Sequence, residues 1–213
     1  LVKKASMSKD KEIKKEAELL EKIKDSLEKN IPVRSLDFED DEWGLIKHFN
    51  LITAKPIIYM ANVSEEDVVG GNKYVDDVKS YASKEGSEVI VVCAKLESEL
   101  SELSDDEKEL FLSDLGINES GLDKLIRETY SLLGLETYFT AGTDEVRAWT
   151  FKRGMKAPEC AGIIHTDFQK GFIKAEVMSY EDLVSCGDEK KVKENGKMRL
   201  EGKEYLMQDG DIC

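Results

Sequence analysis

Residues that build metal centres and disulfide frameworks are scarce in this sequence. Its cysteines are scattered, at Cys93, Cys160, Cys186 and Cys213, and none belongs to a Cys-x-x-Cys pair; only two histidines are present. This pattern argues against a zinc site and against a disulfide scaffold. Long apolar runs are missing too, because no stretch approaches the roughly 20 apolar residues that a helix needs to cross a bilayer. The N-terminal run of Lys and Glu lacks the pattern of a signal peptide. We therefore expect a cytoplasmic protein with no metal site and no membrane partner.

Positive charge is also in deficit. The chain carries 31 Lys and Arg against 45 Asp and Glu, a net charge of −14. Contacts to nucleic-acid phosphates need clustered Lys and Arg, so a surface that binds nucleic acid all over is excluded, whereas a local basic patch is compatible with this balance. The length of 213 residues predicts one or two domains.

The first thirty residues have the periodicity of an amphipathic helix. Apolar residues recur at spacings of three and four, at Ile13, Ala17, Leu20, Ile23 and Leu27. The stripe predicts half of a helical hairpin, and the mixed charge of the polar face argues against a membrane-surface helix. A short packed helix or turn is expected around Trp43 and Phe49, with His48 as a packing residue.

An α/β stretch follows. Apolar strands are expected at 56–62 and 89–94, with a helix at 74–84 between them that ends at Gly86. Strand–helix–strand order predicts neighbouring parallel strands joined by a right-handed crossover. Capping-box patterns at Ser104 and Ser120 predict two further helices. The second of these is expected to bury Leu122, Leu125, Ile126, Leu132 and Leu133.

The pattern changes after Gly134 to short strands separated by turns. Strands are expected at 136–140, 145–151, 172–178 and 204–207, a helix at 157–164 and turns at 141–144, 153–154 and 209–210. This segment is typical of a small mixed α+β unit, so we place a domain boundary near 134–136. The last residues, from Asp209, are expected to start a closing strand that the chain does not complete.

The most informative motif is Asn62-Val63-Ser64-Glu65, at the end of the first apolar strand. Parallel strands deliver polar residues to the carboxyl edge of the sheet, where ligands bind in open α/β folds. The motif resembles the Asn-Lys-x-Asp corner of P-loop GTPases, whose carboxylate accepts hydrogen bonds from guanine. Val63 and Glu65 replace the Lys and the Asp, so guanine specificity is not implied. The structural alternative for Asn62 is a strand-end turn residue.

The phosphate-binding half of such a site is absent from the sequence. No Gly-x-x-x-x-Gly-Lys-[Ser/Thr] occurs, and the Gly-Lys pairs at 196–197 and 202–203 lack the earlier Gly. Asp-x-x-Gly occurs at 41–44 and 67–70, but the first follows no apolar strand and the second comes after Asn62. We interpret both as chance matches to a switch motif and expect no catalytic residue in this chain.

A second group of residues combines positive charge with aromatic rings. Basic residues near Phe151, Phe168 and Phe172 are Lys152, Arg153, Lys156, Lys170 and Lys174. Such a face could hold structured RNA or a ribosomal surface; the alternative is an ordinary solvated face over core aromatics. His165 with Asp167 suggests catalysis, but the sequence places no nucleophile beside them. We expect His165 to shape a loop through side-chain-to-backbone hydrogen bonds, or to contact a partner.

Several runs taken together resemble the Obg-like ATPases of the YchF type. They are Asn62–Glu65, Val92–Glu97, Tyr138–Gly142, Glu145–Thr150, Ile164–Ile173, Lys203–Tyr205 and Asp209–Asp211. The resemblance covers nearly everything after about residue 50 and is most specific over 136–173.

The resemblance implies an α/β part followed by an α+β part. Residues 1–49 would be the remnant of a helical, coiled-coil arm and its junction, 50–134 the C-terminal half of a P-loop G domain, and 136–213 a β-grasp TGS domain without its last strand. The intact protein is then expected to bind and hydrolyse ATP with Mg²⁺. The phosphate loop, the switch regions and the Mg²⁺ ligands would precede Leu1, so this chain alone is predicted to be inactive.

The resemblance also assigns site residues. Asn62, Val63 and Glu65 would surround the adenine, and Cys93, Ala94 and Lys95 occupy the fifth GTPase motif, where backbone amides approach the base. The alternative for Cys93 is a small core residue. Contacts to a ribosome or structured RNA would come from Arg153, Lys156, His165, Lys170 and Lys174.

Two other hypotheses stay open at this point. The chain could be a nucleotide-independent module that binds RNA or ribosomes through residues 136–213. It could instead be a structural protein that self-associates through the helical arm or through an exposed sheet edge.

Overall fold

The structure is a computed structural model that describes residues 11–142 and 145–213. The chain divides into two compact units, Leu1–Leu125 and Ile126–Cys213. We describe each unit by itself. Within the described residues, no helix is long and apolar enough to cross a membrane.

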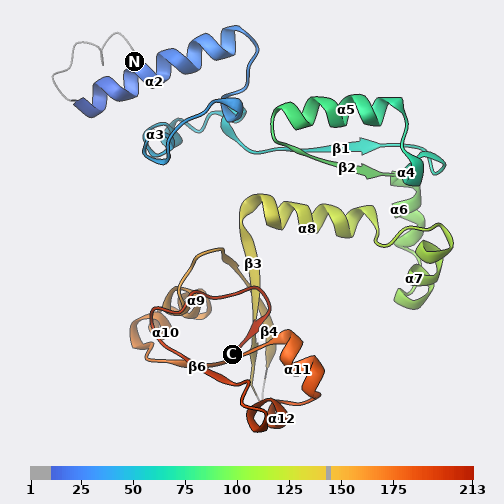
Figure 1. Ribbon diagram of the computed structural model, residues 1–213, viewed down its shortest axis with the longest axis vertical. Coiled ribbons are helices and arrows are strands. Elements are labelled where there is room, and N and C mark those ends of the chain that lie inside the picture. Colours follow the sequence, from blue (N-terminus) through green and yellow to red (C-terminus); the bar gives the residue numbers. More distant parts are fainter. Residues whose placement is uncertain (1–10, 143–144) are drawn as a thin grey trace. The chain divides into compact units, whose positions relative to one another are not determined.

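The first unit begins with the helix α2 (Lys11–Glu28), so the expected N-terminal helix is confirmed from residue 11 onward; residues 1–10 lie outside the described part. Helix α2 packs on α3 (Asp40–Ile46) and on the turn Val33–Ser35, while the turn Lys47–Phe49 contacts α3 and the turn Ile52–Ala54 contacts Val33–Ser35. Figure 1 shows α2 and α3 in the first unit. The core of this region consists of Leu19, Ile23, Val33, Phe38 and Ile46. Leu19 is buried although it was not among the residues of the predicted stripe. Ile13 and Leu27, at the two ends of that stripe, are exposed.

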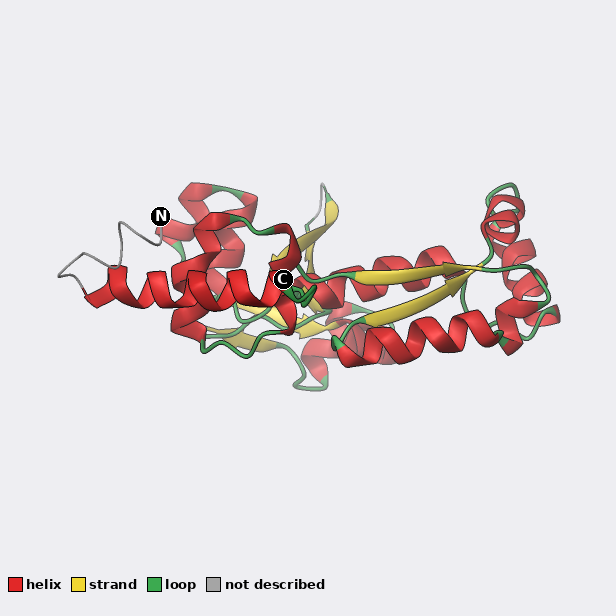
Figure 2. Cartoon of the chain, turned by 90° about the horizontal axis from the view of Figure 1, so that it is seen from above, coloured by secondary structure: helices red, strands yellow, loops and turns green. Residues whose placement is uncertain are grey.

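Two parallel strands follow, β1 (Ile58–Asn62) and β2 (Glu88–Val92), in a register that pairs Asn62 with Val92 (Figures 1 and 2). They are joined by α4 (Asp67–Gly70) and α5 (Lys73–Lys84), and α5 contacts both strands. The expected strand–helix–strand unit is therefore confirmed. The second strand stops at Val92 rather than residue 94, because Cys93 is the N-cap of the next helix.

Three helices follow: α6 (Ala94–Leu100), α7 (Asp105–Asp114) and α8 (Gly121–Leu133), and the division between the units falls within α8. Both capping predictions are confirmed, since Ser104 and Glu107 form a capping box and Ser120 Oγ accepts from the Asp123 N–H at 3.0 Å. The predicted burial of the apolar face of α8 is wrong: Leu122, Ile126 and Leu133 are each more than half exposed. The periodicity identified the apolar face correctly, but the described residues do not cover it.

The second unit contains a five-stranded sheet of order β4-β3-β7-β5-β6. Its strands are β3 (Leu135–Ala141), β4 (Val146–Lys152), β5 (Ala175–Ser179), β6 (Arg199–Glu201) and β7 (Asp211–Ile212). Its helices are α9 (Ala157–Ile164), α10 (Thr166–Gly171), α11 (Tyr180–Cys186) and α12 (Glu189–Glu194). Strands β3 and β4 form an antiparallel hairpin, and β7 pairs parallel with β3 and antiparallel with β5. The mixed α/β character is confirmed. The predicted turn at 141–144 falls partly on residues outside the described part.

One strand prediction in this unit is wrong. Residues 204–207 form no strand, and Leu206 makes only an isolated bridge with Lys156. The reason is a turn fixed by the buried Asp211, whose carboxylate accepts from the Tyr205 hydroxyl and the Gln208 N–H, both at 2.9 Å. The strand that pairs with β5 lies earlier, at Arg199–Glu201.

The core of the second unit gathers around Tyr138 and Phe151, with rings 5.8 Å apart in an edge-to-face arrangement, and includes Ala157, Cys160 and Met207. The Tyr138 hydroxyl donates to the carbonyl of Cys160 at 2.8 Å, so the one polar atom of this ring is satisfied inside the core. Burial raises the pKa of Tyr138 far above its ordinary value and raises the pKa of Cys160 to about 12. These groups therefore stay neutral and serve packing.

Candidate functional site

The carboxyl ends of β1 and β2 form a pocket of about 480 Å³. Its lining residues are Asn62, Val63, Ser64, Glu65, Glu66, Cys93 and Lys95. The predicted base-site residues therefore lie together, apart from Ala94, which takes part through its backbone. The cause is the parallel register: pairing of Asn62 with Val92 brings the two loops that follow these residues to the same edge of the sheet.

Asn62 connects the two loops. Its Oδ1 accepts a hydrogen bond from the Ala94 N–H at 3.0 Å, and the next residue, Val63, donates its N–H to the carbonyl of Val92 at 2.8 Å. Since Oδ1 is engaged by Ala94, the side-chain nitrogen is the atom that Asn62 offers to a ligand. Asn62 is thus more than a strand-end turn residue, because it fixes the position of the neighbouring loop.

Glu65 and Lys95 form an ion pair at the pocket. Lys95 Nζ lies 2.6 Å from Glu65 Oε1 and 3.7 Å from Glu99 Oε1, one helical turn further along α6. The hydrogen bond with Glu65 raises the pKa of Lys95 above its ordinary value. Both members of the pair are substantially exposed, so a ligand can reach them.

Cys93 contributes mainly to the core. Its side chain is 4% exposed and packs with Leu96, Leu100 and Leu112. The alternative that Cys93 is a small core residue therefore describes its environment well. The residue also lines the pocket, because it lies in the loop at the end of β2.

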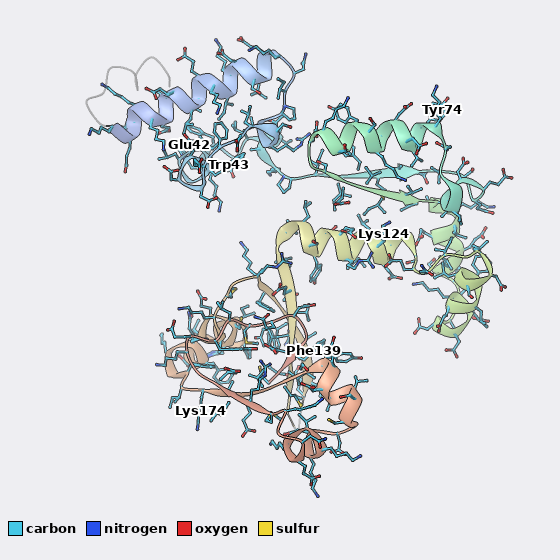
Figure 3. The ribbon with its side chains drawn as sticks, in the orientation of Figure 1. Glu42, Trp43, Tyr74, Lys124, Phe139 and Lys174 are labelled. Atoms are coloured by element: carbon cyan, nitrogen blue, oxygen red, sulfur yellow. The ribbon has the colours of Figure 1, made fainter. Side chains whose placement is uncertain are left out.

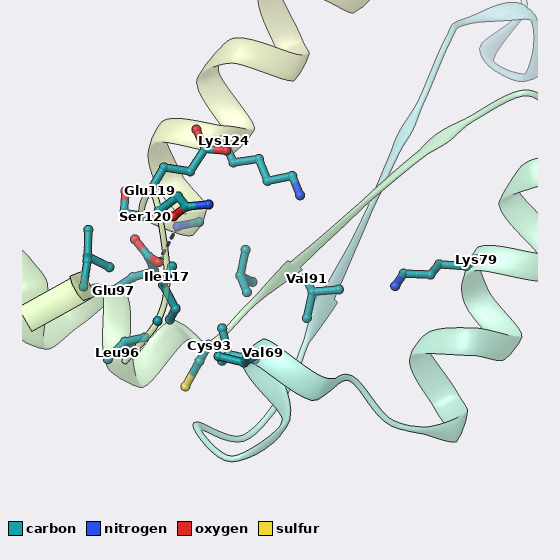
Figure 4. A pocket seen from close by; sticks show the side chains of 16 residues that line it. Val69, Lys79, Val91, Cys93, Leu96, Glu97, Ile117, Glu119, Ser120 and Lys124 are labelled. Carbon is teal, nitrogen blue, oxygen red and sulfur yellow. Dashed lines mark hydrogen bonds between the residues drawn. The ribbon is translucent and has the colours of Figure 1, made fainter. Parts of the chain in front are cut away.

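A second pocket, of about 340 Å³, lies between β2, α6 and the start of α8 (Figure 4). Glu97 joins α6 to the start of α8 at this pocket. Its carboxylate accepts hydrogen bonds from the N–H groups of Gly121 at 2.7 Å and Leu122 at 3.2 Å. A carboxylate at this position satisfies the first amides of α8 and interacts well with the helix dipole. A side chain at Gly121 would place its Cβ 2.7 Å from Val92 Cγ1 and 2.9 Å from Glu97 Oε1, so any other residue would force these neighbours to move.

The sequence analysis did not predict that Glu97 accepts hydrogen bonds from the first amides of α8. Glu97 belongs to one of the runs that carry the family resemblance, but its role depends on contact with a helix that begins 24 residues later. The available signal was Ser120-Gly121 at the start of a predicted helix, where a small residue permits close approach.

The basic residues of the second unit do not form a free cationic face. Arg153 Nε donates to Glu136 Oε1 at 2.7 Å, and Lys156 is paired with Glu204. Lys170 and Lys174 are exposed and have no ion pair within 11–142 and 145–213. Lys174 is labelled in Figure 3.

His165 has the loop-shaping role that we expected. Its Nδ1 accepts from the Asp167 N–H at 3.2 Å and caps α10, and its ring packs edge-on against Phe168. The nearby Asp167 carboxylate lies 3.6 Å from the same nitrogen. His48, in the first unit, stacks on Phe49 with ring centroids 4.0 Å apart, but its side chain is 62% exposed and its Nε2 lies 3.5 Å from Glu16 Oε1, so it packs at the surface rather than in the core.

Lys174 also borders a largely apolar pocket of about 560 Å³ in the second unit. The ring of Phe168 and the side chain of Ile173, both at this pocket, are 56% and 76% exposed. Aromatic and basic groups are therefore adjacent here, as the sequence suggested, but over a smaller area.

Comparisons with known proteins agree with these features. A family model named YchF-GTPase_C, described as "Protein of unknown function (DUF933)", matches residues 135–213. The chain is 57% identical to the ribosome-binding ATPase YchF of Bacillus subtilis, over 99% of this chain and 58% of that protein. It is 41% identical to Obg-like ATPase 1 of Caenorhabditis elegans, over 95% of this chain and 52% of that protein.

The fold has a counterpart among solved structures. The YchF GTPase of Schizosaccharomyces pombe matches with a TM-score of 0.86 and 36% identity, over 99% of this chain and 58% of that chain. A GTP binding protein from Pyrococcus horikoshii matches at a TM-score of 0.54 and 18% identity, which is a likeness of fold alone.

By these matches the chain is related to GTPases and ATPases, and it spans about 58% of the length of the Bacillus subtilis protein. The chain belongs to the YchF family of Obg-like ATPases and corresponds to the C-terminal portion of its members. The resemblance inferred from the sequence is confirmed.

Proposed function

We propose that this chain is the C-terminal part of a cytoplasmic ATPase that binds ribosomes, and that the pocket at the ends of β1 and β2 receives the adenine base. The observation that carries the proposal is the convergence of Asn62, Val63, Glu65 and Lys95 on one pocket at the carboxyl edge of two parallel strands. The names of the relatives, ribosome-binding ATPase and Obg-like ATPase, support the same activity.

The pocket has suitable chemistry for a purine. The Asn62 side-chain nitrogen is a donor for the ring acceptor N7, and Val63 offers an apolar surface for the flat base. Adenine carries a donor amino group where guanine carries the acceptor O6, so the two bases need different partners at that edge.

Binding of the triphosphate and of Mg²⁺ requires residues beyond this chain. The sequence has no phosphate loop, and the described residues include no group of three or more His, Cys, Asp or Glu side chains that could hold a metal ion. Phosphoryl transfer depends on positioning and charge stabilisation by such groups. The 213-residue chain by itself should therefore not turn over ATP.

The domain scheme is also part of the proposal. Residues 1–49 would be a helical arm with its junction, 50–134 part of a G domain, and 136–213 a TGS domain of β-grasp type. Support comes from the start of the family match at residue 135 and from the five-stranded mixed sheet beside α9. The contact division falls earlier, at 125–126 inside α8.

Nucleotide titration of the full-length protein tests the base site. Asn62→Ala removes the donor and frees the Ala94 loop, so ATP affinity should fall about tenfold, in keeping with one hydrogen bond to the base and the loop constraint. Asn195→Ala, an exposed asparagine at the end of α12, is the matched control. Equal ATP affinity in the wild type and Asn62→Ala would contradict the assignment.

A ribosome contact is favoured by one local observation, the exposed Phe168 and Ile173 beside Lys170 and Lys174. Lys170→Glu with Lys174→Glu in the full-length protein should weaken cosedimentation with ribosomes and reduce its salt dependence. Lys190→Glu on α12 is the control, because it changes charge at another exposed helix. Unchanged cosedimentation of the double variant would remove this face from the proposal.

A further inference from the structure

We infer that the ion pair between Lys95 and Glu65 is a specificity device that disfavours guanine in the pocket at the ends of β1 and β2. The inference rests on the proposed function, since it assumes that a purine base occupies this pocket. It assigns to Lys95 a role that the Asn-x-x-Glu motif does not contain.

The carboxylate is the first group concerned. Guanine presents donors at N1 and at its 2-amino group, and the carboxylate of a guanine-specific corner accepts from them. Here the Glu65 carboxylate already accepts from Lys95 Nζ at 2.6 Å, and Glu99 at 3.7 Å helps to hold the lysine at this position. Guanine would have to displace the lysine, whereas adenine has an acceptor at N1 and needs no carboxylate.

The backbone amide of the second loop is the other group concerned. Guanine O6 is an acceptor and requires a donor, which the amide of Ala94 could provide. In this structure that amide donates to Asn62 Oδ1 at 3.0 Å. Adenine presents a donor at the same edge and does not compete for the amide. Both groups that guanine would use are thus engaged within the protein.

The ion pair is exposed, and exposed ion pairs are weak. It should therefore lower the affinity for GTP relative to ATP without excluding GTP from the pocket. Loss of such a pair corresponds to a change of roughly two- to fivefold in an equilibrium constant. GTP affinity should change more than ATP affinity, because the freed Glu65 carboxylate can accept from the guanine N1 and 2-amino groups, whereas adenine N1 is itself an acceptor.

Calorimetric titration of the full-length protein with ATP and with GTP, at one salt concentration, measures the ratio of the two dissociation constants. Lys95→Met should lower the ratio of the GTP constant to the ATP constant about two- to fivefold. Lys95→Arg keeps the pair and should keep the wild-type ratio. Lys73→Met, which removes an equal charge from the start of α5, should also keep it.

The double variant Lys95→Met with Glu65→Gln separates the carboxylate from a general effect of charge. It should lose the gain in GTP affinity, because the acceptor that Lys95→Met exposes is no longer charged. An unchanged ratio in Lys95→Met overturns the inference while leaving the adenine site intact. If Asn62→Ala binds ATP as tightly as the wild type does, the proposed base site is overturned, and the inference is overturned with it.

Discussion

Removal of the Glu85 carboxylate should loosen the attachment of the N-terminal segment to the parallel strands. Glu85 follows α5, and its Oε2 accepts from Arg34 Nε at 3.1 Å, from Arg34 Nη2 at 2.9 Å and from the Tyr59 hydroxyl at 3.0 Å. Arg34 also donates to the carbonyl of Thr53 at 3.4 Å. One carboxylate oxygen therefore joins the segment around Val33–Ser35 to β1 and to the end of α5.

The magnitude follows from burial. The side chains of Arg34 and Glu85 are 17% and 7% exposed, so Glu85→Ala leaves a largely buried guanidinium without its partner. Breaking such a pair from one side costs about 3 kcal/mol, which corresponds to about 100-fold in a local opening equilibrium. Replacing both members by Leu should cost less than either single change, because no uncompensated charge remains.

Hydrogen exchange measured by mass spectrometry on the full-length protein is the assay. Peptides that cover β1 and the end of α5 should exchange about 100-fold faster in Glu85→Ala, whereas peptides from α9 should be unaffected. Unchanged exchange at β1, or a double Leu variant that is worse than both single variants, would refute the reasoning.

The same cluster predicts a dependence on pH. Burial opposes the charged form of Glu85, but the hydrogen bonds from Arg34 and Tyr59 outweigh it and hold the pKa of Glu85 below its ordinary value. A lowered pKa in the folded state contributes stability that is complete above the unfolded value and is lost as pH falls through the folded value. Acidification below about pH 4.5 should therefore accelerate exchange at β1 in the wild type, but not further in Glu85→Ala.

Two substitutions and one alkylation experiment probe the packing. Gly121→Ala places a Cβ 2.7 Å from Val92 Cγ1 and should lower the free energy of unfolding by about 1–3 kcal/mol, measured by urea denaturation. Tyr138→Phe removes the buried hydrogen bond to the carbonyl of Cys160 and should cost about 1 kcal/mol in the same assay; a stabilised variant would contradict this account. Cys160, with its pKa raised to about 12, should resist alkylation at pH 8 until the protein unfolds, whereas the more exposed Cys186 should react first.

Much of the first unit could be predicted because its local signals are strong. Apolar runs located β1 and β2, Gly86 located the end of the helix between them, and strand order implied parallel pairing. The burial of α8 could not be predicted in the same way, since periodicity identifies an apolar face but not the residues that cover it.

The wrong strand at 204–207 has a different cause. Its short apolar run before the Asp209-Gly210 turn signal is typical of a strand, but Tyr205 is hydrogen-bonded to a buried carboxylate six residues later, and this contact makes the segment a turn. Local patterns do not record such contacts.

In the base site, too, local sequence signals predicted some features, whereas contacts between distant residues could not be predicted. Position after an apolar strand pointed to Asn62 and the family resemblance pointed to Lys95, and the parallel strands bring both to one pocket. The pairing of Lys95 with Glu65 joins residues 30 positions apart and depends on the register of the strands. The partners of Arg153 and Lys156 are likewise distant in sequence, which is why the basic face was predicted to be larger than it is.

The position of β7 has a consequence for the order of folding. This strand lies in the middle of its sheet, between β3 and β5, yet it is synthesised after the other four strands, and Phe139 pairs with a residue as distant as Ile212. During synthesis, the β3 edge of the hairpin of β3 and β4 therefore stays unpaired while more than half of the unit is made. Long-range parallel pairing is slow, and an open strand edge invites wrong partners. Completion of this sheet is thus the step at which a nascent chain is most exposed to misassembly.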